Sequence, residues 1–284
     1  MHMPYLAEIS RSNPTAILFL VDLSGSMQNL VGGQEISRAQ FLADALNRVV
    51  ANLIARSSKA EGIRDYFDVG VISYSGRGVK NPLEGPFASK VFNPISLFES
   101  NPIVVEDRVR KIPDGAGGVI DQKIKFPVWF KPDSYGKTPM RKGIVAAAQE
   151  VAQWCDAHPN SYPPTVLHVT DGEASDGDPE SLAEQLCQLS TNDGQTLLFN
   201  LRISNKSQTS LKFPNDEDKV GDKTGMALYR MSSVLPDCVA LAAKEKGYAV
   251  EPGARGFFYN VEPIEIVDFF EIGTRAFSPS LMLK

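Results

Sequence analysis

Residues 16–27, AILFLVDLSGSM, decide the fold of this chain. They open with an apolar run, 17–21, and a continuous run of this kind is typical of a strand covered on both faces, as in parallel sheets. The run ends at Asp22, and two hydroxyl residues follow at Ser24 and Ser26. A carboxylate at the carboxyl end of such a strand lies where open α/β sheets bind ligands. An oxygen-only cluster of this kind favours Mg²⁺ or Mn²⁺ over zinc, which prefers Cys and His.

The order Asp22-Leu23-Ser24-Gly25-Ser26 is the D-x-S-x-S pattern of the metal-ion-dependent adhesion site, so the chain resembles a von Willebrand factor A (vWA) domain. Two later stretches strengthen the resemblance. Residues 136–139, GKTP, precede a helical pattern and look like the second metal loop of the family, and residues 166–172, VLHVTDG, look like the strand and third loop. No ligand position departs from the family pattern. The resemblance implies that one divalent cation, Mg²⁺ or Mn²⁺, is bound by Asp22, Ser24, Ser26, Thr138 and Asp171.

The same resemblance implies a function. In the family the carboxylates often act through bound water, which leaves one coordination position for an acidic side chain of a protein partner. The chain is most similar to intracellular, stand-alone bacterial vWA proteins, including those of tellurite-resistance type, which are often encoded beside a protein kinase and a PP2C-type phosphatase. We therefore expect a metal-dependent protein-binding module, not an enzyme, that acts as a scaffold or regulator in such a circuit.

Two other functions, a phosphotransferase and a hydrolase, fit the residues less well. In a haloacid-dehalogenase-type phosphotransferase a strand-end Asp is the nucleophile and a second Asp two residues later is the acid/base. Asp22 fits the first role, but position 24 is Ser, and no suitably placed Lys is evident for the phosphate. An α/β-hydrolase requires G-x-S-x-G, and the stretch 70–73, GVIS, lacks that spacing.

Composition excludes several classes of protein. The chain has 284 residues, of which 43% are hydrophobic and 22% charged, as in ordinary globular proteins. Its net charge of −5 gives no basic footprint for nucleic acid. No apolar run reaches the ~18 residues of a membrane span, and the first residues have no apolar core, so we expect no signal peptide. Three widely spaced cysteines, 155, 187 and 238, indicate core thiols in a reducing compartment, hence the cytoplasm.

Strand and helix patterns alternate along the chain, which predicts a doubly wound α/β fold with a mostly parallel central sheet flanked by helices. We expect a lead-in over 1–15, a vWA domain over 16–276 and a tail over 277–284. Residues 76–135 are too long and too irregular for a simple loop and are expected to form an inserted small β element, with a hairpin around 114–118. Trp129 and Phe130 in this insertion either shape the rim of the site or only anchor the insertion on the body.

Finer expectations concern single elements. The strand at 66–75 is expected at the edge of the sheet or antiparallel, as the resemblance implies. Residues 204–224 are polar and are expected to form an exposed excursion, with a helix following within 231–246. Gly25 and Gly172 are expected in turns that need positive φ.

Other polar residues near the predicted site can be explained by a structural role as well as by a functional one. The acidic residues Glu173, Asp176 and Asp178 after the third loop either hold a second cation or form a solvated loop with a helix cap; the calcium-loop pattern D-x-D-x-D-G is absent. His168 lies in the middle of a strand pattern and is expected to be a packed core histidine and not a base.

Overall fold

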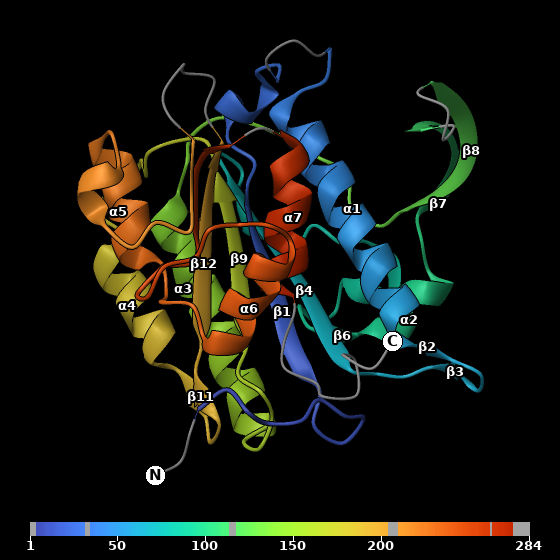
Figure 1. The fold of residues 1–284 in the computed structure, drawn as a ribbon, viewed down its shortest axis with the longest axis horizontal. Coiled ribbons are helices and arrows are strands. Elements are labelled where there is room, and N and C mark those ends of the chain that lie inside the picture. Colours follow the sequence, from blue (N-terminus) through green and yellow to red (C-terminus); the bar gives the residue numbers. More distant parts are fainter. Residues whose placement is uncertain (1–3, 32–34, 114–117, 204–209, 262, 275–284) are drawn as a thin grey trace.

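A mixed sheet forms the centre of the computed structural model, which describes residues 4–31, 35–113, 118–203, 210–261 and 263–274 (Figure 1). Five neighbouring strands in this sheet are parallel, in the order β14-β12-β9-β1-β4. They are β1 (Thr15–Asp22), β4 (Phe67–Ser75), β9 (Thr165–Thr170), β12 (Leu197–Ile203) and β14 (Phe257–Val261). The predicted doubly wound α/β fold with a mostly parallel sheet is confirmed.

Short antiparallel strands flank the parallel core. β13 (Leu211–Lys212) pairs with β14, and both β5 (Gly78–Lys80) and β6 (Asn93–Pro94) pair with β4. The expectation that β4 is antiparallel or at the edge was wrong, because β4 runs parallel to β1 along its whole length, from Thr15↔Phe67 to Asp22↔Tyr74. Its residues are almost all buried, as is typical of an interior parallel strand.

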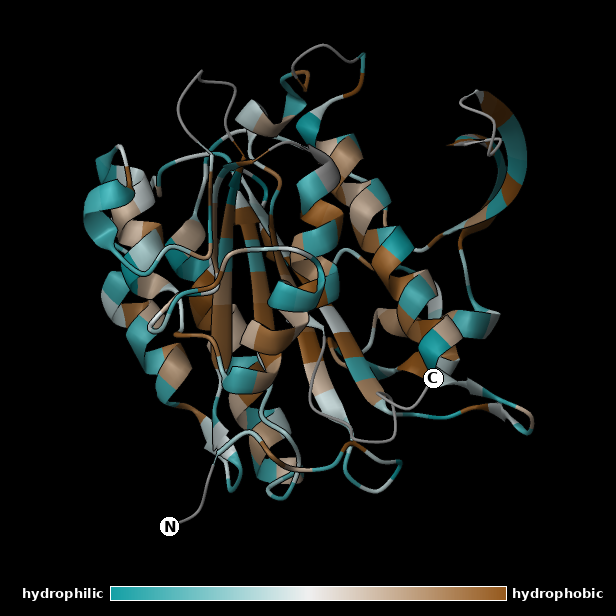
Figure 2. Cartoon of the chain, viewed as in Figure 1, coloured by the Kyte–Doolittle hydropathy of each residue, from teal (hydrophilic) through white to brown (hydrophobic). Residues whose placement is uncertain are grey.

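Helices cover both faces of the sheet (Figure 1). One face carries α1 (Arg38–Ser57), α2 (Ile95–Ser100), α6 (Asp237–Glu245) and α7 (Pro263–Gly273). The other carries α3 (Met140–Ala157), α4 (Glu180–Gln188) and α5 (Lys223–Met231). Along β1, Phe19 packs in the first layer and Leu18 in the second, so every residue of the strand is buried. The brown strands between two-coloured helices in Figure 2 show the same division.

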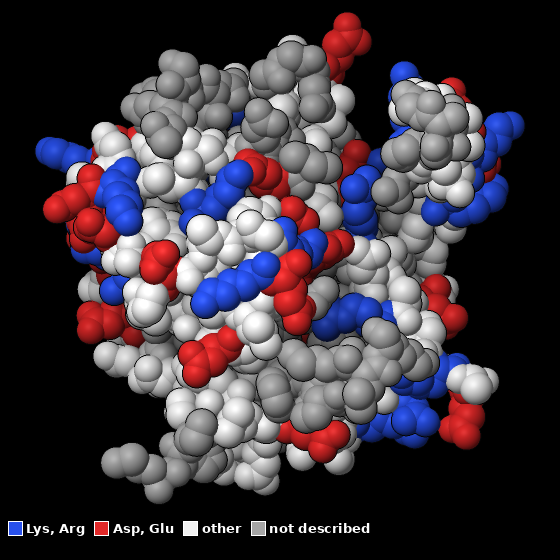
Figure 3. All heavy atoms as spheres, in the orientation of Figure 1, with Lys and Arg blue, Asp and Glu red and all other residues white. Residues whose placement is uncertain are grey.

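The insertion contains a two-stranded ribbon that projects from the body beside α1 and α2 (Figure 1). β7 (Val104–Pro113) and β8 (Val119–Val128) pair antiparallel over their full length. Their ends flank the predicted hairpin at 114–118, of which 114–117 lie outside the described residues. Basic and acidic side chains are interspersed both along the ribbon and over the body on the face shown in Figure 3.

Trp129 and Phe130 anchor the ribbon on the body. Both are buried, and the Oδ1 atom of Asn47 in α1 accepts from the Trp129 amide at 2.9 Å and the Phe130 amide at 3.0 Å. The Asn47 amide group returns a bond of 2.9 Å to the Phe130 carbonyl. Of the two alternatives for these aromatic residues, anchoring is the one their contacts support.

The stretch between β12 and α6 differs from expectation. The predicted exposed excursion at 204–224 contains β13, a 3₁₀ turn η3 (Glu217–Lys219) and the start of α5. Helix α5 begins after Asp222, whose Oδ1 atom accepts from the Gly225 amide at 2.9 Å. Residues 204–209 and the predicted tail at 277–284 lie outside the described part of the chain.

The remaining elements are small. Two further antiparallel pairs and two 3₁₀ turns complete the list: β2 (Ser58–Lys59) with β3 (Gly62–Ile63), β10 (Ser190–Thr191) with β11 (Gly194–Gln195), η1 (Gly25–Gln28) and η2 (Gly85–Phe87). Among the helices of the described residues, none combines the length and the apolar character needed to cross a bilayer.

Candidate metal centre

Three loops converge above the carboxyl ends of β1 and β9. These strands are neighbours, with Val21 opposite Val169, so Asp22 and Asp171 leave the sheet side by side. The second loop is tied to the first by the Gly25 amide, which donates to the Gly136 carbonyl at 2.8 Å. It is tied to the third by the Ser175 amide, which donates to the Thr138 carbonyl at 2.9 Å. The topological switch point between β1 and β9 thus gathers all three predicted loops.

Four of the predicted ligand residues share one hydrogen-bonded cluster. The Ser26 hydroxyl donates to Asp171 Oδ1 at 2.6 Å and lies 3.1 Å from the Ser24 hydroxyl. Asp22 Oδ1 accepts from the Ser24 amide at 2.8 Å, and Asp22 Oδ2 accepts from the Thr170 hydroxyl at 2.6 Å. The first and third loops therefore present two carboxylates and two hydroxyls to one point.

Thr138, the fifth predicted ligand, lies on the facing loop. It is buried, and a Cβ built on Gly172 would lie 3.9 Å from its hydroxyl oxygen. The carbonyl of Thr138 also accepts from the Met140 amide at 2.8 Å, at the start of α3. The Thr138 hydroxyl therefore lies next to Gly172, the residue that follows Asp171.

The cluster is buried except at one corner. Asp22 and Ser24 are buried, the Asp171 side chain has no exposed surface, and Ser26 is exposed. Burial, with a smaller contribution from the negative charge of Asp171, raises the pKa of Asp22 to about 6. A carboxylate that holds its proton this strongly lacks a counter-charge, and a divalent cation would supply one. Ser26 is therefore the corner at which the cluster meets solvent.

The donor set fits a hard cation. Its members are all oxygen atoms, as Mg²⁺ and Mn²⁺ prefer, with no nitrogen or sulfur among them. No group of three or more His, Cys, Asp and Glu side chains in the described ranges is arranged to hold a metal. A metal site here must therefore use hydroxyl oxygens.

Two polar residues of this cluster were missed by the sequence reasoning. Arg38, the first residue of α1, is buried and its Nη1 atom forms an ion pair with Asp171 Oδ2. A basic residue in the first turn of a helix opposes the helix dipole, and this mismatch is the signal that marks Arg38. Thr170 is the second, and its only signal is a hydroxyl at the end of the strand next to β1.

The acidic loop after Asp171 caps helices. Asp176 accepts from the amides of Arg141 and Lys142, each at 3.1 Å, at the start of α3. Asp178 accepts from the Glu180 amide at 2.9 Å at the start of α4. Of the two alternatives for these residues, the cap is the one the contacts support.

The glycines of the loops serve close approach more than turns. Neither Gly25 nor Gly172 has positive φ, contrary to expectation. In the second and third loops the glycines with positive φ are Gly136, at 66°, and Gly177, at 104°. A Cβ on Gly25 would lie 3.3 Å from backbone atoms of Gly136, and a Cβ on Gly76 would lie 2.8 Å from its Cα. Three stretches of backbone meet here at distances that side chains would prevent.

A row of buried polar groups runs under the cluster across the sheet. Tyr74 Oη lies 2.7 Å from His168 Nε2, and His168 Nδ1 lies 2.7 Å from Asn200 Oδ1. The Asn200 amide nitrogen donates to Ser232 Oγ at 2.9 Å and to the Leu228 carbonyl at 3.3 Å. Because a carbonyl only accepts, Asn200 Oδ1 must face His168, so Nδ1 carries the proton and Tyr74 donates to Nε2. Burial lowers the pKa of His168 to about 4, which supports a neutral core histidine.

The sequence matches no known family description and no curated protein. Solved structures do resemble it. Proximal thread matrix protein 1 from the mussel byssus is 13% identical with a TM-score of 0.50, over 94% of this chain. This chain spans about half of that protein, 48% of its length.

Two weaker likenesses have lower TM-scores. The manganese-loaded TRAP protein of Plasmodium vivax is 12% identical with a TM-score of 0.42, over 91% of this chain and 72% of its own. The vWF domain of the pilus tip protein Mfa5 from Porphyromonas gingivalis is 17% identical with a TM-score of 0.31, over 57% of this chain and 39% of its own. Strand order, helical layers and the likeness to the mussel protein together give the chain a doubly wound, Rossmann-like α/β fold.

Proposed function

We propose that the chain is a metal-dependent protein-binding module. A divalent cation, Mg²⁺ or Mn²⁺, would be held by Asp22, Ser24, Ser26, Thr138 and Asp171, and an Asp or Glu of a protein partner would complete its coordination. The observation that carries the proposal is the convergence of the three loops, in which four of these residues share one cluster that opens at Ser26. The cation supplies a Lewis-acidic centre, and the protein residues hold and orient it.

The phosphotransferase alternative is weaker. Asp22 is fully buried, and both of its carboxylate oxygens already accept hydrogen bonds, from Ser24 and Thr170. A nucleophile must be within reach of the substrate, and Asp22 has no exposed surface. The position two residues later carries a serine that cannot act as acid/base at neutral pH. The same two hydrogen bonds suit a carboxylate that acts on a metal through water.

We further propose that the partner belongs to a bacterial kinase or PP2C-type phosphatase circuit in the cytoplasm. The basis is the sequence resemblance to stand-alone bacterial vWA proteins. Cytoplasmic location is also supported by Cys155, Cys187 and Cys238, which are all free thiols. A pull-down from a bacterial lysate with Mg²⁺ and with EDTA tests this part, and a kinase or phosphatase retained equally in EDTA would contradict it.

Calorimetric titration with Mn²⁺ tests the metal site. We expect Asp22→Ala and Thr138→Ala to abolish binding, because each removes an oxygen ligand, while the circular dichroism spectrum stays that of the wild type. Thr191→Ala is the matched control, since Thr191 has the same exposure as Thr138, 8%, and lies at the opposite end of the sheet in β10. It should bind Mn²⁺ like the wild type.

Two results would overturn the proposal. One is unchanged Mn²⁺ affinity in both the Asp22→Ala and the Thr138→Ala protein. The other is turnover of a phosphomonoester with Mg²⁺ that Asp22→Asn abolishes, which would favour the phosphotransferase.

A further inference from the structure

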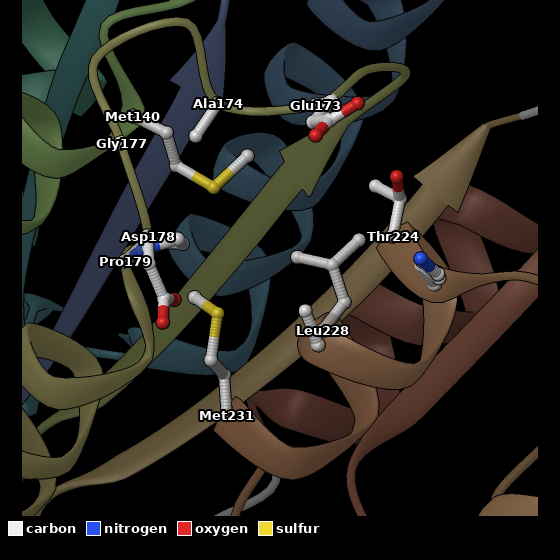
Figure 4. A pocket seen from close by; sticks show the side chains of 11 residues that line it. Met140, Glu173, Ala174, Gly177, Asp178, Pro179, Thr224, Leu228 and Met231 are labelled. Atoms are coloured by element: carbon white, nitrogen blue, oxygen red, sulfur yellow. The ribbon is translucent and has the colours of Figure 1, made fainter.

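A pocket of about 370 Å³ opens directly beside the metal loops (Figure 4). One wall comes from the start of α3 and from the third loop, through Met140 and Ala174, and the opposite wall comes from α5 through Leu228 and Met231. The thioethers of Met140 and Met231 point into the pocket from opposite sides, and Leu228 lies to one side of them. The pocket therefore lies between the candidate metal centre and a helix that has no part in that centre.

The floor and the rim of the pocket differ in chemistry. Met140, Leu228 and Met231 are almost fully buried and make an apolar floor. Two of these are methionines, whose flexible thioether side chains adapt to apolar groups of different shape. The rim carries the exposed carboxylates of Glu173 and Asp178. The exposed Lys223 of α5 also lines the pocket, so the charge at the rim is mixed. The apolar floor is therefore what distinguishes the pocket, and an apolar side chain suits it.

The pocket lies within reach of one short peptide segment that also contacts the metal. Met140 is two residues from Thr138, and Ala174 is three residues from Asp171. Three residues of extended chain span roughly 10 Å, so the pocket wall lies within that distance of both ligand positions. A partner segment that places a carboxylate on the cation therefore has its side chains up to about three residues away at the mouth of the pocket.

We propose that this pocket receives an apolar side chain from the same partner segment whose Asp or Glu completes the metal coordination. The proposal rests on the proposed function and adds a specificity to it: the recognised segment is bipartite, with an acidic residue and a Leu, Ile, Met or Phe at most three positions apart. The metal selects the carboxylate. The pocket selects the apolar neighbour.

Selection from a phage-displayed library of random decapeptides tests the proposal. Phage are bound to the full chain in Mn²⁺ and eluted with EDTA, and enriched sequences are made as free peptides. We expect enriched peptides to share an acidic residue with an apolar residue at most three positions away. Replacing that apolar residue by Gly should weaken binding by about tenfold or more, the loss expected for one buried aliphatic side chain.

Variants of the pocket provide the second arm. Ala227 lines the pocket on α5 and is half-buried, so Ala227→Phe should fill the pocket and remove the difference between the apolar peptide and its Gly version. Ala174→Phe fills it from the third loop and guards against poor folding of the first variant. Ala240→Phe is the matched control, a half-buried alanine on α6 in the other helical layer. Mn²⁺ binding should stay at the wild-type level in all three.

The outcomes separate the two proposals. Acidic peptides eluted by EDTA without a preferred apolar neighbour, or an apolar preference that survives both Ala227→Phe and Ala174→Phe, would overturn the pocket and leave the metal-dependent module intact. A library that yields no EDTA-eluted acidic peptides would overturn both.

Discussion

The loops above β1 and β9 and the ribbon formed by β7 and β8 are held in place in opposite ways. The loops come from three distant parts of the sequence and are fixed to one another by backbone bonds, by a buried ion pair and by glycine contacts. The ribbon is one continuous stretch whose strands pair mainly with each other, and several of its apolar side chains are exposed, Val105, Val109, Val119 and Ile120 among them. The position of the loops therefore depends on the whole fold, whereas the position of the ribbon depends only on the contacts at its base.

This difference indicates how far the effect of a substitution extends in each region. A change in the metal loops alters contacts between elements far apart in the chain, so both stability and ion binding respond. A change in the outer ribbon alters only its own hairpin. The base of the ribbon is the exception, because Asn47 ties it to α1.

The largest effect should come from the base. Asn47→Ala removes the partner of three buried backbone groups, the amides of Trp129 and Phe130 and the carbonyl of Phe130. We expect the free energy of unfolding, measured with urea, to fall by about 4 kcal/mol, since each buried group left without a partner costs about 1–3 kcal/mol. Asn52→Ala on the same helix loses one bond, to Glu271, and should cost under about 1 kcal/mol. Equal losses in both variants would mean that Asn47 is not the anchor.

The glycine contacts of the loops should give the next effect. Gly76→Ala places a Cβ 2.8 Å from the Gly136 backbone, so one loop must move. We expect a loss of about 2–3 kcal/mol in stability, typical of overpacking, together with weaker Mn²⁺ binding by calorimetry. Gly172→Ala is the control, because its Cβ meets only the Thr138 hydroxyl at 3.9 Å and its φ is not positive. A stable Gly76→Ala protein would show that the close approach is not required.

The buried Asp22 carboxylate should make the free energy of unfolding of the metal-free protein depend on pH. Burial raises the pKa of Asp22 from its ordinary value of 3.8 to about 6 in the folded chain, so its contribution to stability is present at low pH and is lost as the pH rises through this window. Asp22→Asn removes that loss. We expect the stability of the variant relative to the wild type to rise by about 2 kcal/mol between pH 4 and pH 7 in EDTA. A difference that stays constant over this range would contradict the buried, uncompensated carboxylate.

The outer ribbon should give the smallest effect. Val109 and Lys123 are opposite each other, so residues 110–122 can be replaced by an Asn-Gly turn that closes the shortened hairpin. The ion pair between Arg108 and Asp44 at the base is kept. We expect stability to change by less than about 0.5 kcal/mol and Mn²⁺ affinity to stay the same, because surface changes away from buried contacts are nearly neutral. A large loss in either quantity would mean that the outer ribbon contacts the body.

Much of the fold could be predicted from sequence because its strands are buried on both faces. Such strands give continuous apolar runs, as in β1, and their polar ends point to the edge where the loops meet. The direction of β4 could not be read in this way. The apolar content of β4 is interrupted by Asp68, Gly70 and Ser73, so it gave no clear continuous run, and the family analogy led to the wrong choice.

Helix α5 was missed for a different reason. Its sequence, KTGMALYRM, contains Gly225, which weakens any helix and suggests a break. In the structure a Cβ at this position would lie 2.6 Å from the Tyr259 ring, so the glycine allows the helix to approach β14. Local propensity opposed the helix and tertiary packing favoured it. One wall of the pocket beside the metal loops was therefore hidden from the sequence.

The polar row from Tyr74 to Ser232 has an electrostatic consequence. Its hydrogen bonds all donate in one direction, away from β4 and toward the carboxyl end of α5, because the Leu228 carbonyl fixes the orientation of Asn200 and hence of His168. The aligned bonds form a permanent dipole through the middle of the sheet, with its negative end at the Tyr74 oxygen. That end lies on the strand next to Asp22, at register position Asp22↔Tyr74, so the interior itself contributes negative potential where a cation would rest.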